Sequence, residues 1–130
     1  MRVFFRNNFN LQAGFDGAVL EVSFDNGLTF QDILTAGGTF IYGGYNGSIS
    51  TCCGNPLAGR EAWTGNSGGF IQTTANLPTP LGSSLMLRWR MGSDSSMAGE
   101  GWRVDSVAVA VPCPRPPPRT RPRPTPAPRP

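Results

Sequence analysis

Two apolar runs that lie close together constrain this chain most strongly. The first run is residues 85–91. Its side chains alternate between two faces: Leu85, Leu87, Trp89 and Met91 lie on one face, and Met86, Arg88 and Arg90 lie on the other. A period of two is typical of a β-strand with one buried side. The second run, residues 101–109, follows a glycine-containing connection and carries Trp102 and Val104. The two runs predict neighbouring parts of one sandwich.

Further short segments of this kind fill the chain up to residue 111. Strands are predicted at residues 2–6, 18–24, 28–34, 39–42, 48–51, 69–76, 84–91 and 101–111, which are rich in Phe, Val, Ile, Leu and Thr. Asn26 and Gly27 predict a type I′ hairpin turn, because both residues tolerate positive φ. No segment shows a sustained helical period. The predicted fold class is all-β: a two-sheet antiparallel β-sandwich of jelly-roll type, with residues 35–63 as a long irregular crossover.

The composition changes sharply after residue 111. Residues 1–111 carry the sandwich, whereas residues 112–130 contain ten prolines and five arginines and no large apolar side chain. That composition predicts a disordered Pro/Arg-rich linker or tail of polyproline character. Without the tail, six basic residues stand against eight acidic ones, a balance near −2. Nucleic acid is therefore not an expected partner, except through the arginines of the tail.

The absence of histidine and lysine narrows the possible chemistry. Histidine is the commonest general base and the commonest metal ligand. Residues 65–69 place Ser67 in a context similar to the nucleophile of trypsin-like proteases, but that mechanism needs a histidine to take the serine proton. We interpret this segment as a turn, and we predict that the chain is not an enzyme. The alternative is a hydrolase that uses two carboxylates at a defined separation across a cleft.

Three cysteines, Cys52, Cys53 and Cys113, make an odd number. Adjacent residues of an extended segment point to opposite faces, so we expect Cys52 and Cys53 neither to bond to each other nor to share a metal. In an exported protein Cys53 could pair with Cys113 and fix the start of the tail to the sandwich. Three unpaired thiols are the alternative.

Several blocks of the sequence resemble one family in the same order. Residues 15–33 contain the runs Phe-Asp-Gly-Ala-Val-Leu-Glu-Val-Ser and Asp-Asn-Gly-Leu-Thr-Phe, and further blocks are residues 43–50, 55–60, 62–69 and 101–105. They are similar to MAM-like jelly-roll modules of bacterial secreted proteins, such as the accessory domains of immune-inhibitor-A-type metallopeptidases. The resemblance implies a non-catalytic sandwich attached to a larger exported protein. Complete modules have strands before the position that matches Arg2, so we expect the N-terminal strands to be lacking here.

Two sets of residues are candidates for binding. Tyr42, Tyr45 and Trp63 fall in the irregular middle segment, where exposed aromatic rings could stack on sugars, although such rings also fill small cores. No cofactor is predicted, with a structural Ca²⁺ as the alternative, because carboxylates in loops supply the oxygen ligands that this ion takes. Similar jelly-roll modules often carry such an ion. Asp16 and Asp105 are the preferred ligands, and ordinary solvated or arginine-paired charges are the other interpretation of these carboxylates.

The leading functional hypothesis is a non-catalytic accessory or adhesion module of an exported or cell-surface bacterial protein. Its loops would contact a partner, either neighbouring domains of a larger exported protein or a surface glycan or protein. The alternative is a carbohydrate-binding module that uses Tyr42, Tyr45 and Trp63. The expected location is extracellular or at the cell surface, although residues 1–6 are too short and too charged to be a signal peptide. No apolar run is long enough to span a membrane.

Overall fold

The computed structural model describes residues 1–79, 84–95, 99–111 and 128 of the chain. These residues form short strands and no helix. The strands are β1 (Arg2–Asn10), β2 (Gly17–Ser23), β3 (Gln31–Asp32), β4 (Thr39–Tyr42), β5 (Gly47–Ser48), β6 (Glu61–Ala62), β7 (Ile71–Asn76), β8 (Met86–Gly92) and β9 (Gly101–Ala110). The all-β prediction is confirmed. The predicted tail, apart from Pro128, and Cys113 lie outside the described residues.

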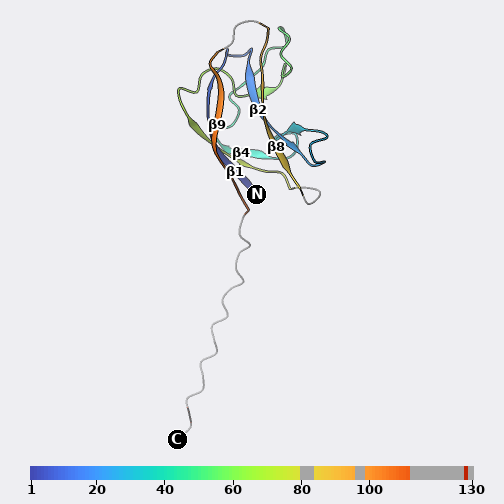
Figure 1. The fold of residues 1–130 in the computed structure, drawn as a ribbon, viewed down its shortest axis with the longest axis vertical. Helices are drawn as coiled ribbons and strands as arrows, with labels where there is room; N and C mark the ends of the chain where they lie inside the picture. Colours follow the sequence, from blue (N-terminus) through green and yellow to red (C-terminus); the bar gives the residue numbers. More distant parts are fainter. Residues whose placement is uncertain (80–83, 96–98, 112–127, 129–130) are drawn as a thin grey trace.

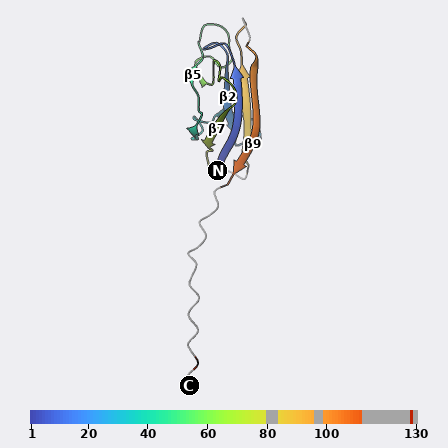
Figure 2. The same ribbon diagram turned by 90° about the vertical axis from the view of Figure 1, so that its left-hand side faces the viewer.

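The strands form a large sheet and a small sheet. The large sheet has the order β4-β7-β1-β9 and the small sheet the order β3-β2-β8, while β5 pairs with β6. All pairings are antiparallel. In the ribbon view the long strands β1 and β9 run beside each other along the sandwich (Figures 1 and 2). This arrangement agrees with a two-sheet sandwich, whereas the jelly-roll connectivity stays a prediction.

The main core lies between the inner faces of the two sheets. Its buried members come from β1, β2, β7 and the loops: Val3, Phe5, Phe9, Leu11, Ala18, Leu20, Val22, Ile33, Trp63, Ala75 and Leu77. Leu85, Leu87 and Trp89 of the β8 region pack against it, as the period of two predicts. Met91 was predicted to be buried with them, but its side chain is 48 % exposed. The reason is that β8 is the edge strand of the small sheet, and among the described residues it pairs with β2 alone.

The predicted strand positions hold best for the long strands. Residues 28–34 were predicted as a strand, but only Gln31–Asp32 pair, and Leu28 is 85 % exposed. The predicted turn is confirmed: Asn26 has φ 59° and Gly27 has φ 87°. Asp25 closes this turn by accepting hydrogen bonds from the backbone N–H of Thr29 and from the Ser23 hydroxyl. β6 was not predicted, because two residues give no period.

Residues 43–63 are the later part of the crossover predicted at residues 35–63, and we call them the crossover segment. This segment packs on the outer face of the small sheet. Val19 of β2 forms a second core with Ile49, Leu57 and Ala62 of this segment. Gly17 and Gly92 are paired across β2 and β8. A Cβ on Gly17 would lie 2.5 Å from the Ile49 side chain, and one on Gly92 would lie 2.8 Å from that of Leu57. The two glycines therefore let the crossover segment approach the sheet closely.

Candidate functional site

A group of charged side chains lies where the crossover segment meets the outer face of the small sheet. Glu21 of β2 is directly opposite Asp32 on β3 and Arg88 on β8, so the three side chains share one face. Arg60 reaches the same point from the crossover segment. We call Glu21, Asp32, Arg60, Arg88 and Arg90 the ionic cluster.

Glu21 is the centre of the ionic cluster. Its Oε2 is 2.9 Å from Nη1 of Arg60, and its Oε1 accepts hydrogen bonds of 2.8 and 2.6 Å from Nε and Nη2 of Arg88. Nη2 of Arg60 also donates to Oδ2 of Asp32 at 3.0 Å. Arg90 is more distant, with Nη1 3.8 Å from Oε2 of Glu21. Since the Glu21 side chain is only 3 % exposed, these contacts lie largely out of water.

The contacts explain the charge state of the cluster. Burial by itself would raise the pKa of Glu21, but the hydrogen bonds and positive charges of Arg60 and Arg88 together lower it. The same carboxylates raise the pKa of Arg60 against the effect of its burial. Glu21 is therefore ionised at neutral pH, the opposite of the protonated form that a general acid needs. The cluster acts as an electrostatic clamp between sheet and crossover segment.

Tyr45 extends this clamp. Its hydroxyl accepts a hydrogen bond of 2.9 Å from the backbone N–H of Leu20 and donates to Oδ2 of Asp32 at 2.9 Å. Burial, and then the charge of Asp32, raise the pKa of the Tyr45 hydroxyl well above its usual range. The hydroxyl therefore stays protonated and serves as a structural bridge between β2 and β3.

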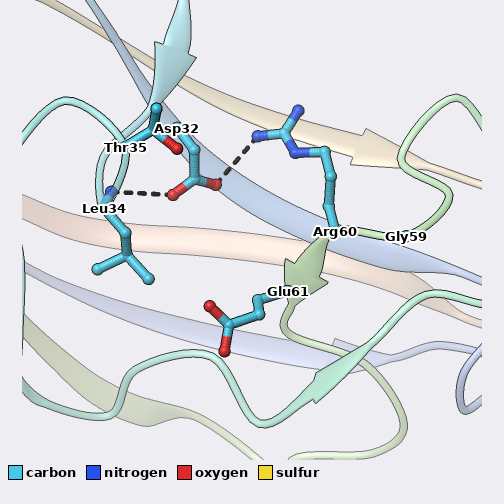
Figure 3. Close-up of a pocket in the computed structure, with 6 residues that line it drawn as sticks. All are labelled: Asp32, Leu34, Thr35, Gly59, Arg60 and Glu61. Carbon is cyan, nitrogen blue, oxygen red and sulfur yellow. Dashed lines mark hydrogen bonds and ion pairs between the residues drawn. The ribbon is translucent and has the colours of Figure 1, made fainter.

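A shallow pocket of about 260 Å³ borders the ionic cluster. Its described lining consists of Asp32, Leu34, Thr35, Gly59, Arg60 and Glu61 (Figure 3). Asp32 accepts a hydrogen bond from the backbone N–H of Leu34 at 2.9 Å and another from Arg60. Both polar groups that face one another in the pocket thus already have protein partners. This favours a structural role for the pocket wall.

The cysteines contradict the sequence prediction. Cys52 and Cys53 form a disulfide with each other, so Cys53 is not available to Cys113. The prediction failed because it assumed an extended backbone, whereas residues 51–53 form a bend. The disulfide lies at the Asn10 end of β1, where the backbone N–H of Ser50 donates to the carbonyl of Gly14. The last residue of β9 pairs with Arg2, at the opposite end of β1.

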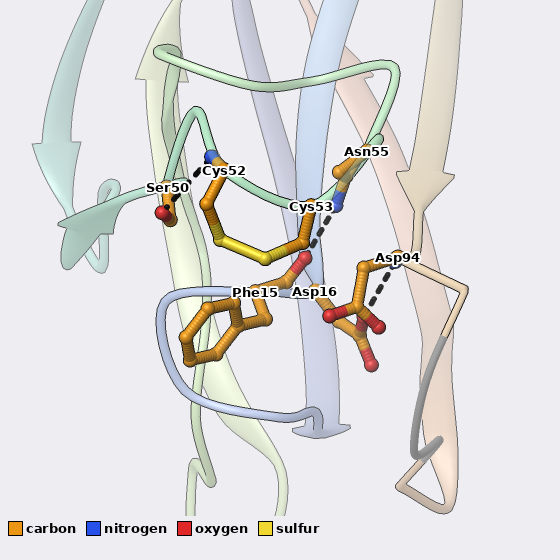
Figure 4. The surroundings of a disulfide bond; sticks show 7 residues. All are labelled: Phe15, Asp16, Ser50, Cys52, Cys53, Asn55 and Asp94. Atoms are coloured by element: carbon orange, nitrogen blue, oxygen red, sulfur yellow. Dashed lines mark hydrogen bonds between the residues drawn. A yellow bond between two sulfur atoms is a disulfide. The ribbon is translucent and has the colours of Figure 1, made fainter.

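The loop that carries the disulfide, residues 50–59, is fixed at its base. Nδ2 of Asn55 donates to the carbonyls of Phe15 and Gly92 at 2.6 and 3.0 Å, and its Oδ1 accepts from the backbone N–H of Leu57. Figure 4 shows the disulfide beside this anchor. Asn55 and Leu57 are buried, while Cys52 is exposed and Cys53 is half-buried. We call residues 50–59 the disulfide loop.

The predicted aromatic platform does not form. Trp63 is fully buried, and its Nε1 donates to the carbonyl of Gly43 at 3.0 Å. Tyr45 packs edge-on against Trp63, with ring centroids 4.8 Å apart. Only Tyr42 is well exposed, at 67 %. The interpretation of Tyr45 and Trp63 as ligand-binding residues is therefore wrong, because the small core uses both rings for packing.

The two predicted metal ligands are not brought together. Asp16 is buried before β2, and its Oδ1 accepts from the backbone N–H of Asp94 at 3.0 Å. Asp105 lies in the other sheet, on β9, opposite Arg6 of β1. In the part of the chain that the structure describes, no three acidic or cysteine side chains form a group suited to a metal. Asp16 instead acts as a hydrogen-bond acceptor that holds the end of β8 near β2.

Ser67, which resembles a protease nucleophile in sequence, fixes a turn. Its hydroxyl oxygen accepts from the backbone N–H of Phe9 at 2.9 Å and donates to the carbonyl of Gly69 at 2.6 Å. Gly68 and Gly69 both have positive φ. The interpretation of residues 65–69 as a glycine-rich turn is confirmed.

The comparisons with known proteins leave these features to be interpreted from their own chemistry. No family model, curated protein or solved structure matches this chain. The resemblance to MAM-like modules accordingly stays a prediction from the sequence blocks. Among the described residues there is no helix with the length and apolar character needed to cross a membrane.

Two carboxylates, Glu21 of the ionic cluster and Asp25 of the turn after β2, predict how stability depends on pH. The pKa of Glu21 is lowered from 4.5, and the hydrogen bonds from Thr29 are the main cause that lowers the pKa of Asp25 from 3.8 to about 2. A carboxyl whose pKa is lower in the folded state stabilises the fold at pH values above its unfolded-state pKa. This stabilisation is lost as the pH falls through the folded-state pKa. We therefore expect the free energy of unfolding to hold down to about pH 4.5 and to decrease from there to about pH 2. Urea titrations across this range measure it, and stability that rises on acidification would contradict the assignment.

Proposed function

We propose that this chain is a non-catalytic recognition module of an exported or cell-surface bacterial protein, and that it contacts its partner through the disulfide loop. The observation that carries the proposal is the disulfide between Cys52 and Cys53 at the surface of an anchored loop. Disulfides persist mainly in oxidising compartments, which supports a location outside the cytoplasm.

The construction of the disulfide loop supports a role in recognition. Asn55 and Leu57 fix its base, and the disulfide links the exposed Cys52 to the half-buried Cys53. A loop that is rigid before binding loses little conformational entropy when a partner docks. Loops held on a rigid sheet are also where binding residues concentrate. The loop therefore offers a preorganised surface for either a glycan or a protein.

The chemistry of the groups described above supports the proposal that the chain is not an enzyme. The Ser67 hydroxyl is engaged in a turn, Glu21 is ionised and bound by two arginines, and the chain has no histidine. None of these groups has the proton state or the freedom that acid–base or nucleophilic catalysis requires. Recognition makes no such demand.

The proposal predicts that binding depends on the disulfide loop. Fluorescently labelled protein should bind at least one of three probes: intact bacterial cells, purified peptidoglycan or a glycan array. Replacing Cys52 and Cys53 together with serine should reduce that binding about tenfold or more, because the loop then samples other conformations before it docks. Thermal melting should change little, since the loop tip lies outside both cores.

The matched control is Cys113→Ser, which also removes a cysteine sulfur and should leave binding unchanged. Alkylation of the native protein should label one thiol per chain, since Cys52 and Cys53 are bonded. Equal binding by the double variant would remove the disulfide loop from the function. Failure of the wild-type protein to bind any of the three probes would contradict recognition of a surface.

A further inference from the structure

The two sheets of the sandwich differ in width, and the difference leaves one flank open. The large sheet has β9 at its edge beyond β1, whereas the small sheet ends at β8. Phe5 of β1 already contacts Trp89 of β8, with ring centroids 5.5 Å apart. β9 therefore extends past the edge of the small sheet. We call the side bounded by β8 and β9 the open flank.

The register shows that apolar side chains face this open flank. Val3 and Val109 are directly opposite each other on β1 and β9, so both point to the inner face. Val3 is fully buried, yet Val109 is 48 % exposed. Val107, two residues before Val109 on β9, has the same 48 % exposure. Inner-face valines of a sandwich are normally covered, but the described residues leave these two about half exposed.

The core near the open flank also contains polar groups without partners. The indole Nε1 atoms of Trp89 on β8 and Trp102 on β9 are buried and have no hydrogen-bond acceptor among the described residues. The same is true of Nδ2 of Asn7 on β1, the neighbour of β9. Buried donors are almost always paired in folded proteins. All three lie on strands at or next to the open flank.

The edge of β8 is suited to accept another strand. Natural edge strands are usually shortened, bent by a bulge or otherwise protected against pairing. β3 has only two residues, and the pairings of β4 and β9 contain register shifts. β8 is different, because its seven residues pair with β2 in one continuous register. Its other backbone edge has no partner strand among the described residues.

The charges beside this edge indicate what kind of strand would fit. Arg88 and Arg90 project from the outer face of β8, with side chains 42 % and 38 % exposed. The ionic cluster holds three arginines and only two carboxylates, which leaves one positive charge in excess. Arg90 is the least well paired, because its one carboxylate contact among the described residues spans 3.8 Å. An acidic side chain opposite Arg90 would complete the cluster.

We propose that the edge of β8 binds an extended strand of a partner polypeptide in which apolar residues alternate with acidic ones. The strand would pair with the backbone of β8 and become the fourth strand of the small sheet. Its apolar side chains would cover Val107 and Val109 on the inner face. Its acidic side chains would lie opposite Arg88 and Arg90 on the outer face. This surface is separate from the disulfide loop and does not depend on the function proposed for that loop.

Synthetic peptides test this proposal directly. A peptide in which valine alternates with glutamate should bind the wild-type chain with micromolar affinity, as expected for one added strand. A peptide with lysine in place of glutamate should bind at least about tenfold more weakly, because like charges then lie opposite Arg88 and Arg90. A proline in the middle of the glutamate peptide should abolish binding, because it removes a ladder donor. Hydrogen exchange of the amides of residues 86–92 should slow on binding.

Two pairs of variants separate this site from other surfaces. Arg90→Glu should reverse the preference from the glutamate peptide to the lysine peptide, whereas Arg103→Glu, with the same charge change on the outer face of β9, should not. Val109→Lys should weaken binding about tenfold, whereas Ala108→Lys, one residue away on the opposite face, should have little effect. Circular dichroism confirms that each variant is folded.

Three outcomes would overturn the proposal. The first is a folded wild-type chain that does not bind the glutamate peptide. The second is binding without slower exchange in residues 86–92, which would place the peptide elsewhere. The third is a concentration-dependent dimer that Val109→Lys dissociates and that excludes the peptide, which would make a second copy of this chain the occupant of the open flank.

Discussion

Trp63→Ala is expected to lower the free energy of unfolding by about 4 kcal/mol, the usual cost of deleting a fully buried aromatic ring. The ring is completely buried and lies within 6 Å, centroid to centroid, of four others: Phe5 and Trp102 at 5.9 Å, Phe40 at 5.5 Å and Tyr45 at 4.8 Å. Its backbone also pairs with Ala18 of β2. Because small domains are stable by only about 5–15 kcal/mol, about a quarter to four fifths of the stability would be lost. Urea unfolding followed by circular dichroism measures the change.

Tyr42→Ala is the matched control for this substitution. The Tyr42 side chain is 67 % exposed on β4, so its removal should change the free energy of unfolding by less than about 0.5 kcal/mol. The contrast also separates the two interpretations of the aromatic residues. A Trp63→Ala protein that remains fully stable but loses binding to polysaccharide would contradict the packing role and support the ligand-binding role that the sequence suggested for Trp63.

The long strands could be predicted because their side chains alternate between core and surface over many residues. β8 has its inner residues at Leu87 and Trp89, and β4 was predicted with its observed bounds. β1 was predicted too short, ending at residue 6 instead of Asn10. The apolar alternation breaks at Asn7, a polar residue that is nevertheless buried on the inner face. Its Oδ1 accepts a hydrogen bond from the Thr73 hydroxyl, which makes this burial possible. A hydropathy pattern cannot anticipate such a partner on another strand.

The site was harder to predict than the fold. Glu21 is a lone charge in an apolar strand whose seven residues are all buried, and that isolation was the available signal. Its partners depend on which residues of β3 and β8 lie opposite it and on Arg60, which is 39 positions away in the chain. The hydrophobic pattern predicts faces of strands, but it does not determine the register between them. The ionic cluster therefore emerged only from the tertiary structure.

Glu21→Gln is expected to lower the free energy of unfolding by about 3 kcal/mol, because it leaves Arg60 and Arg88 beside a buried neutral amide. The substitution preserves size and shape, so the loss reflects charge and hydrogen bonding. It should also flatten the decrease in stability between about pH 4.5 and pH 2, since the variant has no carboxyl at this position to protonate. Urea titrations at neutral and acidic pH measure both effects.

Glu61→Gln is the control, because Glu61 is exposed on β6 and belongs to the same pocket wall. Its free energy of unfolding should change by less than about 0.5 kcal/mol. Equal effects of the two substitutions would mean that the ionic cluster adds nothing beyond surface charge.

Arg60→Gln then tests whether the cluster acts as a clamp on the crossover segment. Arg60 is the member of the cluster that this segment contributes, so its loss should speed proteolysis and amide exchange in residues 43–63 more than in β1 or β7. The double variant Glu21→Gln with Arg60→Gln should lose less free energy of unfolding than the sum of the losses in the two single variants, because both substitutions break the same interaction. Strict additivity would show that Glu21 and Arg60 stabilise the chain independently. The crossover segment would then be held on the small sheet by its apolar contacts with Val19 rather than by the charges on β2.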